Sequence, residues 1–231
     1  MYRSATLVVG NFDRRGTDDV QTILIANPKG GSGKTTVATN VAGFIAGKRQ
    51  RVVLADEDPQ QSATQWLARR PALFPQVLPM PSERRELRGI DPHWVVVDSP
   101  AGLHGERLRD EIRRADVMLV PLAPSAFDMA ATARFLAQIA EYKAVKGGEL
   151  AVALVANRVD ARTHSAAELD AFLQAFDFPL VAHLRDTQVY VGCARDGASV
   201  FDLPRSRAEA DWAQWKPLTR WLARQARAAS P

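Results

Sequence analysis

The sequence has very little cysteine, because Cys193 is the only one among 231 residues. A single cysteine excludes a disulfide framework and any metal or iron–sulfur site that needs several cysteines from one chain. Long hydrophobic runs are also missing, since no segment approaches the roughly 20 continuous apolar residues that span a bilayer. The N-terminal stretch MYRSATLVVGNFDRR has too short an apolar run for a signal peptide. We therefore expect a cytoplasmic protein.

Charge is modest overall but unevenly distributed. The chain has 30 basic and 26 acidic residues, which gives a formal net charge of +4. From Arg205 onward there are six basic and two acidic residues, so the whole net charge lies in the last 27 residues. The composition, 46% hydrophobic and 24% charged, is that of an ordinary globular protein. The basic C-terminal region therefore needs a functional explanation.

Short apolar runs alternate with helical patterns from Val20 onward. Continuous apolar strands alternating with helices are typical of a parallel sheet that helices cover on both faces. We predict an α/β fold with a mostly parallel twisted sheet of about seven to eight strands, in one domain of residues 20–231. Residues 1–19 are expected to form a loosely ordered extension. Strands are expected within residues 20–27, 51–56, 93–100, 116–124, 149–160 and 178–184, and helices within residues 34–47, 61–70, 105–115, 126–145 and 165–176. The proline-rich stretch 69–89 is expected to hold a surface loop and a short edge strand.

Four short motifs follow these apolar runs: NPKGGSGKTT, DEDPQ, DSPAG and NRVD. In parallel α/β sheets, ligands bind beyond the carboxyl ends of the strands. Each motif would stand at that edge of the sheet. We therefore expect the four segments to converge on one site.

The first motif, residues 27–36, nearly matches a phosphate-binding loop, G-x-x-x-x-G-K-[ST]. Its glycines would let backbone N–H groups turn toward phosphate oxygens. Lys34 would reach the outer phosphates, and the Thr35 hydroxyl would bind Mg²⁺. The pattern departs from the rule at its start, where Pro28 stands in place of the first glycine and Lys29 adds a positive charge.

The segment KGGSGKTT resembles the deviant Walker A motif of the ParA/MinD class of ATPases, in which an early lysine replaces the early glycine. The resemblance implies ATP and Mg²⁺ as cofactors and a homodimer that forms with ATP. It further implies that Lys29 reaches the phosphates of the partner subunit's nucleotide, where it would offset the repulsion between two triphosphates. Lys29 and Lys34 are thus expected to act in catalysis. The residues expected to bind the nucleotide in this loop are Gly30, Gly31, Ser32, Gly33, Lys34, Thr35 and Thr36.

The other three motifs supply acids and turn residues. DEDPQ resembles the second motif of the same family, which implies that Asp58 positions the attacking water and that Asp56 supports the metal. Asp98 ends a buried strand, as a metal-orienting acid should, and the backbone N–H of Gly102 would sense the γ-phosphate. The resemblance places Asn157 at the base, although asparagine before a turn is also a common turn former.

The C-terminal region holds a basic amphipathic helix, expected to begin after Pro217 because proline suits the first helical position. Arg220, Arg224 and Arg227 fall on one stripe. The other side is broadly apolar and comprises Leu218, Trp221, Leu222 and Ala229. Such a helix could be an ordinary solvated surface helix, a phosphate-binding stripe for DNA or an interfacial membrane helix like that of MinD.

We favour DNA over membrane, because Trp212, Trp215 and Trp221 look like packing residues and no linker separates the helix from the domain. In this interpretation Arg205 and Arg207 extend the stripe. Arg185 is a weaker candidate for the same surface.

The sequence thus predicts a ParA-like ATPase, similar to small single-domain proteins that position cargo. It would dimerise with ATP, bind DNA non-specifically on the nucleoid and partition or position a DNA or protein cargo. A ParB-like or cargo-adaptor partner would stimulate slow hydrolysis. A preceding helix-turn-helix domain is absent from the sequence, which disfavours an autoregulating plasmid ParA. The alternatives are a MinD-like membrane ATPase and a small-molecule metabolic enzyme of the same loop class.

Overall fold

A computed structural model describes residues 20–83 and 86–228. Its sheet has seven strands in the order β3-β2-β4-β1-β5-β6-β7, and every neighbouring pair is parallel. The predicted fold class and strand number are therefore confirmed. The strands are β1 (Gln21–Ile25), β2 (Val52–Asp56), β3 (Leu78–Pro79), β4 (Trp94–Asp98), β5 (Val117–Leu122), β6 (Ala151–Val159) and β7 (Leu180–Arg185).

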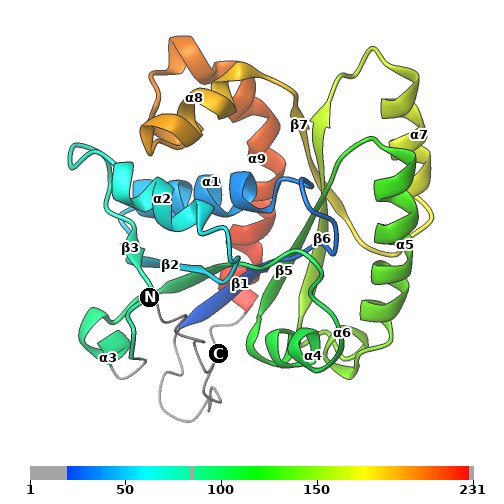
Figure 1. The fold of residues 1–231 in the computed structure, drawn as a ribbon, viewed down its shortest axis with the longest axis horizontal. Coiled ribbons are helices and arrows are strands. Elements are labelled where there is room, and N and C mark those ends of the chain that lie inside the picture. The colour runs from blue at the N-terminus through cyan, green and yellow to red at the C-terminus, as the bar shows by residue number, and fades with distance from the viewer. Residues whose placement is uncertain (1–19, 84–85, 229–231) are drawn as a thin grey trace, which may run out of the picture.

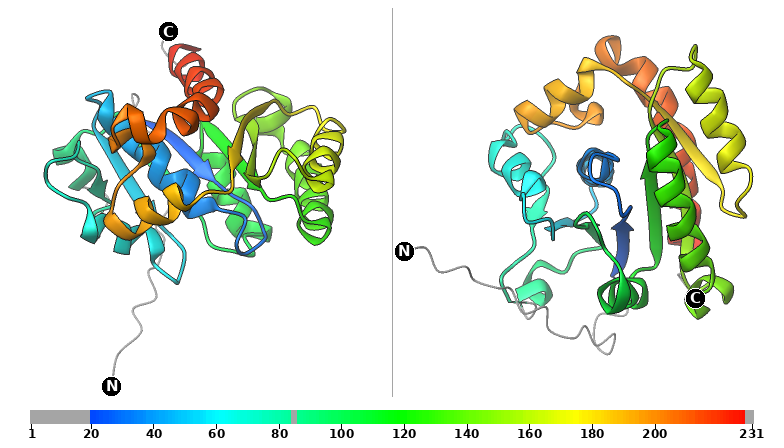
Figure 2. Two further views of the ribbon diagram at one scale, coloured as in Figure 1. Left: turned by 90° about the horizontal axis from the view of Figure 1, so that it is seen from above. Right: turned by 45° about the vertical axis from the view of Figure 1, so that its right-hand side comes forward.

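Helices cover both faces of this sheet (Figures 1 and 2). One face carries α1 (Lys34–Gly47), α2 (Ser62–Arg69), α8 (Gln188–Asp196), the 3-10 turn η2 (Val200–Asp202) and α9 (Arg205–Ala228). The other face carries α3 (Leu87–Ile90), α4 (Gly105–Arg114), α5 (Ala126–Ala140), α6 (Lys143–Lys146) and α7 (His164–Leu173).

The strands form because their apolar runs are buried on both sides. Ile23 and Ile25 belong to the core under α1, whereas Leu24 between them belongs to the core under α4 and α5. This alternation follows from the two-residue period of a strand. The result is two separate cores with the sheet between them, which holds the carboxyl ends of the strands along one edge.

The long helix expected over residues 126–145 is wrong in one respect. α5 ends at Ala140, Tyr142 adopts an extended conformation, and α6 begins at Lys143. The turn lets Tyr142 and the residues of α6 pack against the same core as α5. Packing therefore outweighs the local helical pattern, which is continuous through this segment.

The C-terminal helix is also longer than expected. α9 begins at Arg205, and Pro217 lies inside it and not at its start. Pro217 is exposed, and buried Trp215 and Leu218 flank it on the core side. Because residues on both sides of the proline are buried, the helix continues although Pro217 has no backbone N–H to donate.

The structure also contains α8, which the sequence pattern did not predict.

The short strand β3 confirms the expected edge strand within residues 69–89. The predicted extension, residues 1–19, lies outside the described residues.

Cys193 lies on α8 and points into the core that α1 and α9 share. It is 3% exposed, and burial raises the pKa of its thiol to about 11. The thiol is therefore a packing group in this fold.

Candidate functional site

The phosphate-binding loop, residues 27–36, connects β1 to α1 at the carboxyl edge of the sheet. Gly33 has a φ of 94°, and a Cβ atom at this position would lie 1.9 Å from the Asn157 side-chain nitrogen. That nitrogen donates a hydrogen bond of 3.0 Å to the Ser32 carbonyl. Glycine is thus required both by the left-handed backbone and by the close approach of Asn157. Asn157 therefore stabilises the loop through this hydrogen bond, and its contact with a base stays a prediction.

Lys34 begins α1 and is buried, with 6% of its surface exposed. Its ammonium donates to the carbonyl oxygens of Asn27 (3.2 Å) and Lys29 (3.0 Å), so it lies inside the curve of the loop. Burial lowers its pKa, and the carboxylates of Asp98 and Asp58 oppose that shift. These hydrogen bonds hold the Lys34 ammonium where the lysine of a phosphate-binding loop contacts phosphate oxygens.

Asp98 ends β4 next to Ile25 of β1 and opposite Asp56 of β2. The Thr35 hydroxyl donates a 2.7 Å hydrogen bond to Asp98 Oδ2. Burial raises the pKa of Asp98 to about 7; the Thr35 hydrogen bond lowers it, and the nearby Asp56 carboxylate adds to the rise. Asp98 Oδ1 is buried and has no hydrogen-bond partner among the described residues, and the same holds for the Ser99 hydroxyl.

These atoms fit Mg²⁺. A buried carboxylate oxygen without a partner, beside a threonine hydroxyl, is the kind of hard oxygen ligand that Mg²⁺ takes. Within the described ranges no three His, Cys, Asp or Glu side chains cluster so as to hold a metal by themselves. Mg²⁺ normally uses one or two protein oxygens and completes its octahedron with water and phosphate, so two ligands suffice.

The two acids of DEDPQ differ in their contacts. Asp56 accepts hydrogen bonds at both oxygens, from the backbone N–H of Asp58 (3.2 Å) and of Thr64 (2.7 Å). It therefore fixes the turn that leads into α2. Asp58 accepts from the N–H of Gln60 through Oδ1 at 2.9 Å, and its side chain is half-buried beside the site. Asp56 therefore stabilises the conformation of the loop, and Asp58 is the acid that the loop places beside the site.

Gly102 and Lys29 both form backbone hydrogen bonds with the first residues of the phosphate-binding loop. The Gly102 N–H donates to the Pro28 carbonyl at 2.9 Å, so the DSPAG segment is tied to the phosphate-binding loop. A contact with a γ-phosphate would require this bond to open. Lys29 is half-buried, and its backbone N–H donates to Asn27 Oδ1 at 2.9 Å.

Sequence reasoning missed two buried polar residues of the site. The Asn27 side chain donates to the Pro121 carbonyl (2.8 Å) and to the Thr132 hydroxyl (3.1 Å), which anchors the loop to β5 and α5. Ser99 is fully buried directly after Asp98. The position of Asn27, between a buried strand and a glycine loop, is the one signal that could have indicated its role. Ser99 offers no comparable signal.

The C-terminal arginines belong to a different surface. α9 packs Trp215 (0% exposed) and Trp221 (7% exposed) into the core, and Arg220 and Arg224 are exposed. Trp212 is partly buried against the same core. The expectation that the three tryptophans are packing residues is therefore confirmed. The side chain of Arg227 and residue Ala229 lie outside what the structure describes.

The remaining arginines of the predicted stripe differ in their contacts and in their positions on α9. Arg205 forms an ion pair with Glu209 at 2.7 Å and lies on the same side of α9 as Arg220. Arg207 lies on another side of the helix, where its charge acts on Cys193 and Asp196 of α8. Arg185 pairs with the fully buried carboxylate of Asp211 at 2.8 Å. Arg185 therefore has a structural partner, and contacts of Arg205 and Arg207 with DNA stay predictions.

A parallel sheet with a glycine loop between β1 and α1, a buried lysine at its end and a threonine–aspartate pair defines a nucleoside-triphosphate-binding protein of the phosphate-loop class. The family profile described as the CobQ/CobB/MinD/ParA nucleotide binding domain matches residues 23–191. The chain belongs to this family and is a ParA/MinD-like ATPase.

Relatives agree with this assignment. The chain is 30% identical over 200 residues to the maintenance of carboxysome distribution protein A of Halothiobacillus neapolitanus, covering 82% of this chain and 91% of that protein. The structure of MinD from Pyrococcus horikoshii with Mg-ADP is similar in fold, with a TM-score of 0.68 at 18% identity over 91% of this chain and 99% of that one. Apo McdA from Cyanothece gives a TM-score of 0.67 at 17% identity over 85% and 98%.

Proposed function

We propose that this ATPase pairs with a second copy when ATP is bound, binds duplex DNA without sequence preference, and positions a protein or DNA cargo. A partner protein of ParB-like or cargo-adaptor type stimulates hydrolysis and resets the cycle. The observation that carries the DNA-binding part is the orientation of α9, which buries its tryptophans and exposes Arg220 and Arg224. The protein would therefore be associated with the nucleoid.

In the nucleotide site, Lys34 contacts the outer phosphates, and the backbone of the loop surrounds them. The Thr35 hydroxyl and the Asp98 carboxylate would hold Mg²⁺, which would neutralise charge on the phosphates. Asp58 orients the attacking water, with Asp56 as its support through the turn they share. The half-buried position of Asp58 and the hydrogen bonds that fix Asp56 support this division.

Pairing would bring two nucleotides face to face, and Lys29 offsets their repulsion. Its place at the mouth of the loop, two residues after Asn27 anchors the loop to β5 and α5, supports this role.

DNA binding is favoured over a membrane anchor because the large apolar side chains of α9 face the core. No helix in the described part of the chain is long and apolar enough to span a membrane. An interfacial helix would need its tryptophans toward the lipid. A positioning role is supported by the relative whose name describes the distribution of carboxysomes.

Co-sedimentation with random-sequence duplex DNA and with anionic vesicles, in ATP and in ADP, tests this function. We expect ATP-dependent DNA binding that weakens steeply with salt, because each lost phosphate contact reduces the log–log slope by about 0.9. Arg220→Glu with Arg224→Glu should reduce DNA binding at least about tenfold and leave ATP binding intact.

The matched control is Arg113→Glu with Arg107→Glu on α4, which changes the net charge equally on the opposite face of the sheet. Vesicle binding that requires ATP, without DNA binding, would contradict the proposal. Equal loss in the α4 control would show that only net charge matters.

A further inference from the structure

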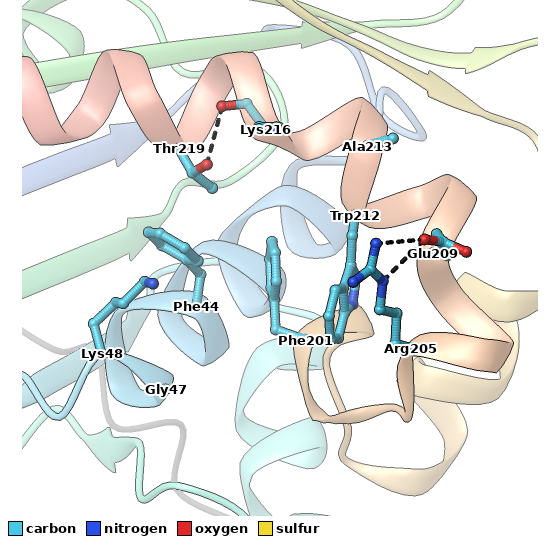
Figure 3. Close-up of a pocket in the computed structure, with 10 residues that line it drawn as sticks. All are labelled: Phe44, Gly47, Lys48, Phe201, Arg205, Glu209, Trp212, Ala213, Lys216 and Thr219. Atoms are coloured by element: carbon cyan, nitrogen blue, oxygen red, sulfur yellow. Dashed lines mark hydrogen bonds and ion pairs between the residues drawn. The ribbon is translucent and has the colours of Figure 1, made fainter.

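A pocket of about 520 Å³ opens between the C-terminal end of α1 and α9 (Figure 3). Phe44 comes from α1 and Lys48 directly follows it, Phe201 comes from η2, and Trp212 and Ala213 come from α9. Its volume lies within the range of roughly 300–1,000 Å³ that is usual for ligand pockets. α1 begins at the phosphate-binding loop and has 14 residues, so the pocket lies about 20 Å from that loop. It is separate from the nucleotide site.

The aromatic floor of the pocket is fixed in place. The Phe201 ring lies between Phe44, with centroids 5.1 Å apart, and Trp215, with centroids 5.8 Å apart. The Trp212 indole donates a 2.6 Å hydrogen bond to the Val200 carbonyl. Phe44, Phe201 and Trp212 each remain partly exposed. A preformed apolar hollow binds without the entropic cost of ordering its own side chains.

The rim of the pocket is positively charged. Lys48 and Lys216 line it, and neither forms an ion pair with another described residue. The Lys48 ammonium lies 5.5 Å from the centre of the Phe44 ring. Arg205 and Glu209 also line the rim but neutralise one another through their ion pair (Figure 3). The pocket thus combines an apolar floor with an excess of two positive charges.

We infer that this pocket, which we call the α1–α9 pocket, is the docking site for an acidic segment of a partner protein. A bulky apolar side chain of the segment fills the hollow over Phe44, Phe201 and Trp212. Flanking carboxylates pair with Lys48 and Lys216. Burial of one aromatic anchor with charged residues at the rim is the usual arrangement of a peptide-binding hot spot.

This occupant fits better than duplex DNA or a second copy of the chain. The aromatic floor is recessed between two helices, whereas duplex phosphates require a protruding row of cations such as Arg220 and Arg224. If the proposed pairing through the nucleotide face is correct, on which this point rests, the pocket lies at the far end of α1 and stays accessible in the dimer. Partner binding is then independent of the bound nucleotide.

The test is fluorescence anisotropy with three labelled ten-residue peptides. One consists of glutamates with a central tryptophan, one has serine in place of the tryptophan, and one has lysines in place of the glutamates. We expect the first peptide to bind wild-type protein equally in ADP and ATP, and at least about tenfold more tightly than the other two. A tenfold difference in Kd corresponds to about 1.4 kcal/mol of binding free energy.

Two kinds of variant locate the site. Ala213→Trp fills the pocket and should abolish binding of the first peptide, whereas Ala223→Trp, an exposed position further along α9, should leave it unchanged. Lys48→Glu with Lys216→Glu should weaken it at least tenfold without altering the fold, because both lysines are exposed. ATP binding and circular dichroism check that each variant is folded.

The inference is overturned if the first peptide does not bind, if the serine peptide binds equally, or if the two tryptophan variants behave alike. It is also overturned if Ala213→Trp removes binding to duplex DNA while peptide binding survives. Wild-type protein is assayed in parallel for ATP-dependent binding to DNA. Failure of that assay alone refutes the proposed function and leaves the docking site standing.

Discussion

At the scale of single residues, Lys34 and Asp98 lie in the same buried region, and their pKa values are shifted in opposite directions. Burial lowers the pKa of the lysine and raises that of the aspartate, because it disfavours the charged form of each side chain. Each offsets part of the other's shift, and the Thr35 hydroxyl stabilises the carboxylate further. A triphosphate with its metal would complete this charge arrangement, which is why we expect the two side chains to act as a unit.

Lys34→Ala should weaken ATP binding by about 1.5–3 kcal/mol, roughly ten- to hundredfold, since a charge-assisted contact is lost.

Asp58→Ala should keep ATP binding and lower the rate of hydrolysis about 10²- to 10⁴-fold, because the water loses its orienting carboxylate. A fluorescent ATP analogue measures binding, and phosphate release measures turnover. Wild-type turnover in Asp58→Ala would remove this residue from the mechanism.

Lys29→Ala should bind ATP but remain a monomer, because the repulsion between two facing triphosphates is no longer offset. Light scattering in ADP and in ATP with Mg²⁺ measures the mass. Lys48→Ala is the matched control: it removes the same charge at the other end of α1 and should still dimerise. An ATP-dependent dimer of Lys29→Ala would contradict the role assigned to this lysine.

At the scale of elements, α2 and η2 are joined by a buried ion pair. Arg70, directly after α2, forms two hydrogen bonds of 2.9 and 3.0 Å with Asp202, and the two side chains are 5% and 2% exposed. Its guanidinium also lies 4.9 Å from the centre of the Trp66 ring. The contact ties the element that follows Asp58 to the segment that leads into α9.

Arg70→Ala should lower the free energy of unfolding by about 3–5 kcal/mol, because it leaves the Asp202 carboxylate buried without its partner. Urea denaturation measures the change. The control is Arg51→Ala, whose ion pair with Asp91 is 49% and 79% exposed and should contribute less than about 1 kcal/mol. Equal losses in the two variants would show that burial does not decide the contribution of these pairs.

α9 contains a proline that its packing tolerates. Pro217 removes one backbone hydrogen bond from the helix interior, which costs up to about 3 kcal/mol relative to alanine. Pro217→Ala should therefore raise the melting temperature. Pro204→Ala, just before α9 begins, should not, because no N–H is needed there. Calorimetry distinguishes the two, and a lower melting temperature for Pro217→Ala would mean that the proline shapes the helix.

At the scale of the whole molecule, the strands and the phosphate-binding loop could be predicted from sequence, since apolar runs and glycine spacing are local signals. α8 and the start of α9 could not, because distant side chains fix them. The Trp66 indole donates to the Ala198 carbonyl, and the Val200 N–H donates to Asn40 on α1. The hidden loop anchor Asn27 and the pairing of Arg185 with Asp211 likewise depend on residues remote in sequence.

The burial of Cys193 has a practical consequence for following this protein. The thiol is 3% exposed and burial raises its pKa to about 11, so at neutral pH little of it is the thiolate that attacks maleimides. A dye offered to the native protein would therefore react very slowly with its own sulfur. A cysteine introduced at exposed Ala223 would be labelled selectively, so single molecules could be tracked with the wild-type core intact.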